Sequence, residues 1–142
     1  MIATIIASAK LIGITPSLLL GLCSVESSLQ NIVNKNDFGS ASYGICQVKE
    51  NTKKHVISLK KFPPCVSVFK KDQLMDISYN SCIAAKYLKY QMERYKGNVR
   101  KALSAYNAGR YVKHNKKYVN KVLSRKKYMT KYTNGDSRGK KK

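Results

Sequence analysis

The chain has 142 residues, and its 28 Lys and Arg outnumber seven Asp and Glu, which gives a formal net charge of +21. This length suits one domain that buries roughly 70% of the surface exposed by its unfolded chain. With 43% hydrophobic residues and only eight Gly and three Pro, the composition excludes disordered, collagen-like and low-complexity classes.

The N-terminal segment is the most apolar part of the chain, but Lys10 interrupts it, so no run reaches the roughly 18 residues of a membrane span. Four apolar residues follow the i, i+3, i+4, i+7 spacing of an amphipathic helix: Ile2, Ile5, Ile6 and Ala9. The segment lacks the basic start of a secretory signal. We therefore expect a packed helix here and no export signal in this chain.

Thr15 followed by Pro16 predicts the start of a second helix, because Thr can cap a helix and Pro suits its first position. Residues 34–48 are rich in Gly, Ser and Asn, which predicts a loop with a short hairpin. Residues 49–75 carry no clear pattern, and a Pro-Pro pair within them excludes a continuous helix.

The second half of the chain predicts three helices. One begins at Asp76 and ends at Gly97, and the next is capped by Asn98 and closed by Gly109. The last holds Tyr118, Val119, Val122 and Leu123. Since no convincing run of alternating strands is present, we expect a single compact domain that is mainly α-helical.

The C-terminus is strongly basic: residues 111–142 carry 12 Lys and Arg against Asp136 alone. Residues 125–142 also lack apolar periodicity, which predicts a folded domain over 1–124 followed by a basic, flexible tail. Such a charge attracts polyanions of any kind. The tail either only solubilises the chain or adds affinity for an anionic surface.

The four cysteines are scattered without a CxxC pair: Cys23, Cys46, Cys65 and Cys82. This spacing argues against a zinc site. Three disulfide pairings remain open, and the favoured interpretation is four buried free thiols. Nothing in the sequence calls for a metal or another cofactor.

Glu26 lies on an unexpected face. It follows Leu22 by four residues and Leu19 by seven, so helical geometry places it on the apolar side. Burial and the negative end of the helix dipole would both raise its pKa. A carboxyl that stays protonated near neutral pH suits a glycosidase acid. The alternative is a Glu at a helix end that reaches solvent or pairs with a Lys.

Four motifs in order identify a family. "VESSLQNIVNKNDFGSASYGICQV", with its Glu-Ser pair and its "GICQ" element, precedes "AYNAG" and "YVNKVL". This order resembles the catalytic domain of SLT-type lytic transglycosylases and, more distantly, goose-type lysozymes, over residues 14–124. The resemblance implies an α+β lysozyme-like fold with its hairpin near 34–48.

The resemblance also assigns residues. Glu26 would be the sole catalytic acid and base, and Ser27 completes the Glu-Ser pair. Gln47 would line the cleft and bind sugar groups, while Tyr106 and Asn107 would flank the scissile bond, with Tyr106 orienting Glu26. Further candidate substrate contacts are Ser40, Ser42 and Tyr43. Since the chain has no Trp, sugar stacking would fall to Tyr43, Tyr106 or Tyr111.

Two regions depart from the family pattern. Cys46 stands where the family often has Met or another apolar residue, so part of the cleft wall is changed. Residues 53–75 match the family poorly, and the resemblance therefore implies no substrate contacts there.

The implied reaction is cleavage of the β-1,4 bond between N-acetylmuramic acid and N-acetylglucosamine in peptidoglycan, with a 1,6-anhydromuramyl product and no metal or cofactor. One alternative is lysozyme-type hydrolysis of the same bond by Glu26 with Asp37 as the second carboxylate. Another is a catalytically inactive wall-binding domain. A basic nucleic-acid-binding module is more remote, because no helix-turn-helix, zinc-finger or RNA-binding signature is present.

The expected partners are peptidoglycan glycan strands and an anionic cell-wall or outer-membrane surface that attracts the basic residues and tail. We expect a monomer that recognises no specific nucleic acid. Such an enzyme acts at the bacterial cell wall or in the periplasm. A stand-alone domain without a signal favours a bacteriophage enzyme, released through a holin or carried by the virion, over a bacterial secretion-system enzyme.

Overall fold

The structure, a computed structural model, describes residues 1–133. The α-helices are α1 (Ile2–Ile12), α2 (Pro16–Ser27), α3 (Glu50–Leu59), α4 (Ile77–Arg94), α5 (Val99–Ala108) and α6 (Lys116–Met129). Short 3-10 helices are η1 (Gln73–Met75), η2 (Lys113–Asn115) and η3 (Thr130–Tyr132). The strands β1 (Ile32–Asp37), β2 (Ser40–Gly44) and β3 (Val48–Lys49) form one antiparallel sheet in the order β1-β2-β3. The predicted mainly helical fold is confirmed.

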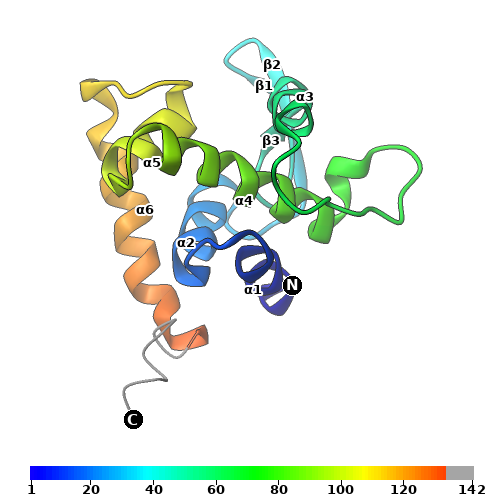
Figure 1. The fold of residues 1–142 in the computed structure, drawn as a ribbon, viewed down its shortest axis with the longest axis horizontal. Coiled ribbons are helices and arrows are strands. Elements are labelled where there is room, and N and C mark those ends of the chain that lie inside the picture. The colour runs from blue at the N-terminus through cyan, green and yellow to red at the C-terminus, as the bar shows by residue number, and fades with distance from the viewer. Residues whose placement is uncertain (134–142) are drawn as a thin grey trace.

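Helix α4 runs through the middle of the molecule, and the other helices lie around it (Figure 1). Its residues Ile83 and Leu88 are almost completely buried. α1 packs against α4 and buries its residues Ile5 and Ala9, and a 2.7 Å hydrogen bond joins the hydroxyls of Ser8 and Ser81. The apolar N-terminal segment is therefore a packed helix, as its spacing predicts. Among residues 1–133, no helix is both long enough and apolar enough to cross a membrane.

The predicted helix starts at Pro16, Asp76 and Asn98 are confirmed, but the Thr15 side chain forms no capping hydrogen bond to α2. The Oδ1 atom of Asp76 accepts hydrogen bonds from the backbone N–H groups of Ser78 and Tyr79 at 3.0 and 3.3 Å, and so caps α4. Asn98 caps α5 in the same way, with 3.0 Å to the N–H of Lys101. These local contacts explain why the helix boundaries can be predicted from sequence.

The predicted hairpin is present and is slightly longer than expected. β1 and β2 pair from Ile32 opposite Gly44 to Asp37 opposite Ser40. The two-residue turn between them consists of Phe38 and Gly39, with φ of 53° and 91°. Turns with two positive φ angles suit the twist of a hairpin. A bulky residue at the first position is strained, yet the Phe38 side chain is 98% exposed.

The expectation of free thiols is wrong. Cys23 pairs with Cys46, and Cys65 pairs with Cys82, with Cα atoms 4.3 and 5.7 Å apart. The first disulfide joins α2 to the segment between β2 and β3, and the second joins the α3–η1 segment to α4. Sequence spacing could not select this pairing, because the fold brings each pair together.

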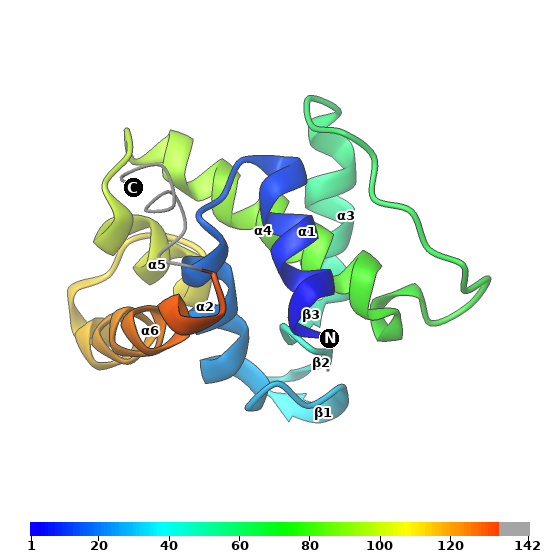
Figure 2. The same ribbon diagram turned by 90° about the horizontal axis from the view of Figure 1, so that it is seen from below.

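The expected boundary at residue 124 falls inside α6, which continues to Met129 and buries its side chain to 4% exposure. α6 lies along α2 in close contact (Figure 2). A Cβ atom at Gly21 would lie 2.7 Å from the backbone N of Lys126, so glycine permits this approach. Residues 125–133 thus belong to the folded part, and the rest of the expected tail, 134–142, lies outside the described residues.

Candidate active site

Glu26 is the penultimate residue of α2, and its half-buried side chain lines a cavity of about 500 Å³. Leu19 and Leu22 on the same helix are fully buried, which is why the helical period turns Glu26 toward the interior. The helix ends at Ser27, and the next residue, Ser28, caps it with a left-handed φ of 57°. The carboxyl therefore stands in the last turn, at the negative end of the helix dipole.

Tyr118 of α6 contacts this carboxyl directly. Its hydroxyl donates a 2.6 Å hydrogen bond to Oε2 of Glu26. Burial and the nearby carboxylate raise the pKa of the Tyr118 hydroxyl well above its usual value, so Tyr118 remains a neutral donor. The sequence predicts Tyr118 only as a helix residue and assigns the orienting role to Tyr106. The structure gives the hydrogen bond to Tyr118 instead.

Burial raises the pKa of Glu26 from its ordinary 4.5 to about 7. The hydrogen bond from Tyr118 opposes this increase, because it favours the ionised carboxylate, and the negative charge of Asp37 adds to it. Burial has the largest effect. Glu26 can therefore hold a proton near neutral pH and can also release it, which is what a group acting as both acid and base requires.

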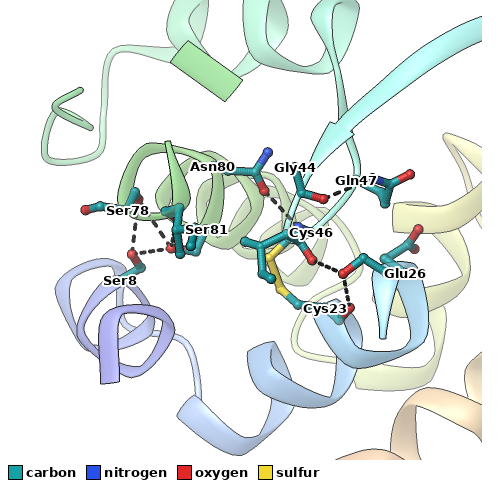
Figure 3. Close-up of a disulfide and its surroundings, with 12 residues drawn as sticks. Ser8, Cys23, Glu26, Gly44, Cys46, Gln47, Ser78, Asn80 and Ser81 are labelled. Carbon is teal, nitrogen blue, oxygen red and sulfur yellow. Dashed lines mark hydrogen bonds between the residues drawn. A yellow bond between two sulfur atoms is a disulfide. The ribbon is translucent and has the colours of Figure 1, made fainter. Parts of the chain in front are cut away.

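Near Glu26, one disulfide and one hydrogen bond join the end of α2 to the segment between β2 and β3. Cys23, three residues before Glu26, forms the disulfide with Cys46 (Figure 3). Ser27, the next residue after Glu26, donates a 2.5 Å hydrogen bond from its hydroxyl to the carbonyl oxygen of Ile45. Together these contacts hold the helix end against the segment that carries Gln47.

Asn80 of α4 holds the same segment from the other side. Its Oδ1 accepts from the N–H of Cys46 at 2.9 Å, and its Nδ2 donates to the carbonyl oxygens of Tyr43 and Leu74 at 2.7 and 2.8 Å. Asn80 is fully buried, so each of these bonds replaces contact with water. The wall beside Glu26 is thus fixed before any substrate binds.

The cavity at Glu26 lies between the hairpin, α3, α4 and the end of α5. The predicted site residues that line it are Glu26, Gln47, Tyr106 and Asn107. The other lining residues are Asp37, Phe38, Val48, Lys49, Thr52, Tyr87, Ala108, Gly109 and His114. The structure therefore brings together four of the eight predicted site residues.

Gln47 and Ser42 are bonded to the protein itself. The hydroxyl of the fully buried Ser42 donates to Oε1 of Gln47 at 2.8 Å. Nε2 of Gln47 donates to the carbonyl oxygens of Ile32 and Gly44, each at 2.9 Å. Gln47 thus joins the hairpin to the following segment, and the expectation that Ser42 contacts substrate does not fit its burial.

Three other predicted contacts lie outside the cavity lining. Ser40 is exposed at the start of β2, and Tyr43 is half-buried further along that strand. Tyr111 lies beside Tyr95, with ring centroids 6.4 Å apart, and Lys101 stands over its ring. Of the aromatic residues proposed for sugar stacking, Tyr106 alone lines the cavity.

Sequence reasoning missed two aromatic residues of the cavity. Tyr87 lies 5.2 Å from Tyr106 between ring centroids, so the two rings form one wall. Phe38 reaches the cavity from the hairpin tip. An exposed Phe in a two-residue turn was the available signal, because that position ordinarily favours Gly, Asn or Asp.

Asp37, the last residue of β1, lines the same cavity and is the second acid there. It forms no hydrogen bond or ion pair with Glu26, but its charge raises the pKa of Glu26. Lys49 donates a 2.5 Å hydrogen bond to the backbone carbonyl of Asp37, which fixes the end of the strand. The structure thus leaves Asp37 available to act with Glu26.

No metal centre is formed by the part of the chain that the structure describes: no three His, Cys, Asp or Glu side chains are grouped so that they could hold an ion. The site has one half-buried carboxyl with a raised pKa, which stands at a helix end and faces a cavity beside a small antiparallel sheet. This arrangement defines a lysozyme-like domain suited to acid–base catalysis.

Comparison with known families agrees with this class. Residues 3–129 match the model of the family described as the transglycosylase SLT domain, and the chain belongs to this family. The fold is similar to that of lytic transglycosylase Slt from Pseudomonas aeruginosa, solved as an inactive mutant, with a TM-score of 0.77 and 22% sequence identity over 95% of this chain. The matched region is 24% of the length of that protein. No curated protein matches the chain by sequence.

Proposed function

We propose that the protein is a peptidoglycan lytic transglycosylase in which Glu26 is the single catalytic acid and base. The observation that carries the proposal is the pKa of about 7 for a carboxyl that lines a substrate-sized cavity and is held by Tyr118. Membership in the SLT family supports both the activity and the substrate class.

In the first step, protonated Glu26 gives its proton to the glycosidic oxygen between N-acetylmuramic acid and N-acetylglucosamine. The bond from that oxygen to C1 of the muramic sugar breaks, and positive charge develops at C1. The 2-acetamido carbonyl oxygen of the same sugar stabilises this centre, so the step needs no second carboxylate. Tyr118 keeps its hydrogen bond to Glu26 and stabilises the carboxylate that forms.

In the second step, the Glu26 carboxylate takes the proton from the C6 hydroxyl of the muramic sugar. The C6 oxygen bonds to C1 and closes the 1,6-anhydro ring, which restores protonated Glu26. The products are an anhydromuramyl end and a free N-acetylglucosamine hydroxyl. No water is consumed, and no net proton is gained or lost.

The cavity supplies the substrate contacts. Tyr106 and Tyr87 present an aromatic wall to the sugar faces, and the exposed side chain of Asn107 offers an amide to hydroxyl or acetamido groups. Gln47 shapes the cavity from the hairpin side through its internal hydrogen bonds. Ser27 acts indirectly, because its hydroxyl is bonded to Ile45.

Hydrolysis of the same bond is the second candidate, because Asp37 lines the cavity with Glu26. In that reaction Asp37 would place a water molecule or stabilise the cation at C1. The product then separates the two reactions. Transglycosylation leaves anhydro ends, whereas hydrolysis leaves reducing ends.

The test uses purified peptidoglycan with the wild type, Glu26→Gln and the matched control Glu93→Gln, which neutralises an exposed Glu that pairs with Lys61 and does not line the cavity. Loss of turbidity should continue in the control and fall by about a hundredfold or more in Glu26→Gln. Mass spectrometry should find 1,6-anhydromuramyl ends. Undiminished cleavage by folded Glu26→Gln would overturn the assignment of Glu26.

The cell wall is the proposed place of action. Both disulfides suit an oxidising compartment such as the bacterial periplasm or the cell exterior. The net charge of +21 would attract the anionic polymers of the wall or outer membrane. The monomeric state and the bacteriophage origin stay predictions from the sequence.

A further inference from the structure

The segment 60–71, between α3 and η1, is the most unusual surface feature outside the cavity. Its sequence, KKFPPCVSVFKK, places an apolar centre between two Lys-Phe ends of mirrored order. It projects from the body of the molecule in both ribbon views (Figures 1 and 2). None of its residues lines the cavity at Glu26. We call it the 60–71 loop.

The tip of this loop exposes apolar side chains to a degree that soluble surfaces usually avoid. Val66 is 72% exposed, Val68 is 85% exposed, and the adjacent Phe69 is 43% exposed. Neighbouring apolar side chains that protrude together point to a surface that is covered in use. The hairpin also exposes apolar side chains, Phe38 at 98% and Ile32 and Val33 at 43% each, but Phe38 lines the cavity at Glu26, whereas no residue of the loop does.

The loop is held in this conformation by its base. The Cys65–Cys82 disulfide ties it to α4. Oδ2 of Asp76 accepts hydrogen bonds from the Ser67 hydroxyl at 3.0 Å and from the N–H of Val68 at 3.2 Å. The apolar tip is therefore presented outward by fixed contacts, and binding to it requires little further ordering of the chain.

Positive charge surrounds the apolar tip. All four lysines of the loop are exposed: Lys60, Lys61, Lys70 and Lys71. Lys61 pairs with Glu93 at 2.5 Å, while the other three form no hydrogen bond or ion pair with residues 1–133. The loop itself contains no acid. An anionic partner would therefore meet at least three unpaired ammonium groups.

The surface behind the loop repeats this combination. A cavity of about 320 Å³ there has apolar walls that include Val56, Phe62 and Ile83. Lys86 lines it and is 7% exposed, and among the described residues no group pairs with its ammonium. Apolar walls beside an unpaired cation suit a lipid acyl chain and its anionic headgroup.

A bilayer fits these features better than a protein groove. The hydroxyl of Ser67 is the sole polar side-chain group between Cys65 and Phe69, and it is occupied by Asp76. The tip therefore offers a protein partner no side-chain hydrogen bond by which to be recognised. A membrane interface needs none, since it takes apolar side chains between headgroups and holds lysines at its anionic surface.

We propose that the 60–71 loop docks the protein onto an anionic lipid bilayer, with Val66, Val68 and Phe69 inserted and the flanking lysines on the headgroups. This inference is independent of the proposed catalytic function. It concerns a different face from the cavity and is measured by binding alone.

Phe69→Trp provides a direct test, because the chain has no Trp and the new residue would be the single reporter. Its emission should shift to the blue on addition of vesicles of phosphatidylglycerol with phosphatidylcholine. Bromine-labelled acyl chains should quench it. Vesicles of phosphatidylcholine alone should give little shift. A protein that sediments with anionic vesicles without any blue shift or quenching would overturn insertion.

Paired variants separate insertion from net charge. Val66→Ser with Val68→Ser should lower the affinity for anionic vesicles about tenfold, also at high salt, whereas Ile32→Ser with Val33→Ser should not. Lys70→Gln with Lys71→Gln should lower the affinity for anionic vesicles about tenfold or more at low salt. The control Lys117→Gln with Lys121→Gln, on α6, removes the same charge and should lower the affinity less. Thermal unfolding checks that each variant is folded.

Any of three results contradicts the proposal. Equal affinity of the valine variant and the wild type would show that net charge alone attracts the protein. Equal losses from the loop lysines and the α6 lysines would show that no particular face is used. Absence of vesicle binding, with capture of an acidic protein instead, would replace the bilayer by a protein partner.

Discussion

The hydroxyl of Tyr118 and the carboxyl of Glu26 are joined by a hydrogen bond of 2.6 Å, although 92 positions separate them in the chain. The bond crosses from α6 to α2 and so links the last long helix to the helix that carries the catalytic carboxyl. This hydrogen bond lowers the pKa of Glu26, which burial raises. Tyr118 is thus a positioning residue whose effect can be read from the pH dependence of the reaction.

Tyr118→Phe should move the alkaline limb of the kcat/KM profile to higher pH, because the lost hydrogen bond stabilises the ionised form of Glu26. kcat should fall about tenfold or more, since a bond to a charged group is lost. Tyr106→Phe is the control, because Tyr106 lines the same cavity and forms no hydrogen bond with Glu26. An unmoved alkaline limb in Tyr118→Phe would count against the coupling.

Glu26→Gln should remove a pH-dependent part of the stability. A carboxyl with a pKa raised from 4.5 to about 7 favours folding fully below pH 4.5, and this contribution is lost as the pH rises through 7. The wild type should therefore lose up to roughly 3 kcal/mol relative to Glu26→Gln between pH 4 and 8. Urea unfolding at several pH values measures the difference. Parallel curves for the two proteins would contradict the raised pKa.

Asp37→Asn separates the two candidate reactions. If Glu26 acts alone, the variant should still produce anhydromuramyl ends. Its alkaline limb should move to lower pH, because the charge of Asp37 raises the pKa of Glu26. This direction is opposite to that of Tyr118→Phe. A loss of activity by about a hundredfold or more, together with reducing ends from the wild type, would favour hydrolysis.

The two disulfides should differ in function but not much in stability. Removal of either pair by Ala substitution should cost about 3 kcal/mol, because the closed loops are similar, with separations of 23 and 17 residues. Only Cys23→Ala with Cys46→Ala should reduce cleavage of soluble glycans, since that bond holds the end of α2. Equal activity of both variants, measured below their unfolding temperatures, would argue against this role.

Salt should affect binding to the wall more than the chemistry. The screening length falls to about 3 Å at 1 M salt, so salt weakens the attraction between the net charge of +21 and the wall. The hydrogen bond between the half-buried Glu26 and Tyr118 is screened less. Sedimentation with intact sacculi should therefore weaken strongly from 50 mM to 500 mM salt, on the order of tenfold or more. Turnover of short soluble glycans should change little. Equal salt sensitivity of both would place the charge within the catalytic step.

Local signals in the sequence determined much of the helical part. Asp76 and Asn98 act on N–H groups two or three residues away, so their capping role needs nothing from the rest of the fold. The period of α2 likewise determined that Glu26 faces the interior, because Leu19 and Leu22 set the apolar face. The order of the motifs then identified the family.

The tertiary structure alone decided which groups contact Glu26 on the inward face of α2. Periodicity reports that Tyr118 points inward, but its contact with Glu26 depends on the close approach of α2 and α6 at Gly21. The disulfide pairing and the bonding of Gln47 inside the hairpin depend in the same way on distant segments. Helix caps and helical faces follow from neighbours in the chain, whereas the site is made by contacts that only the packed fold creates.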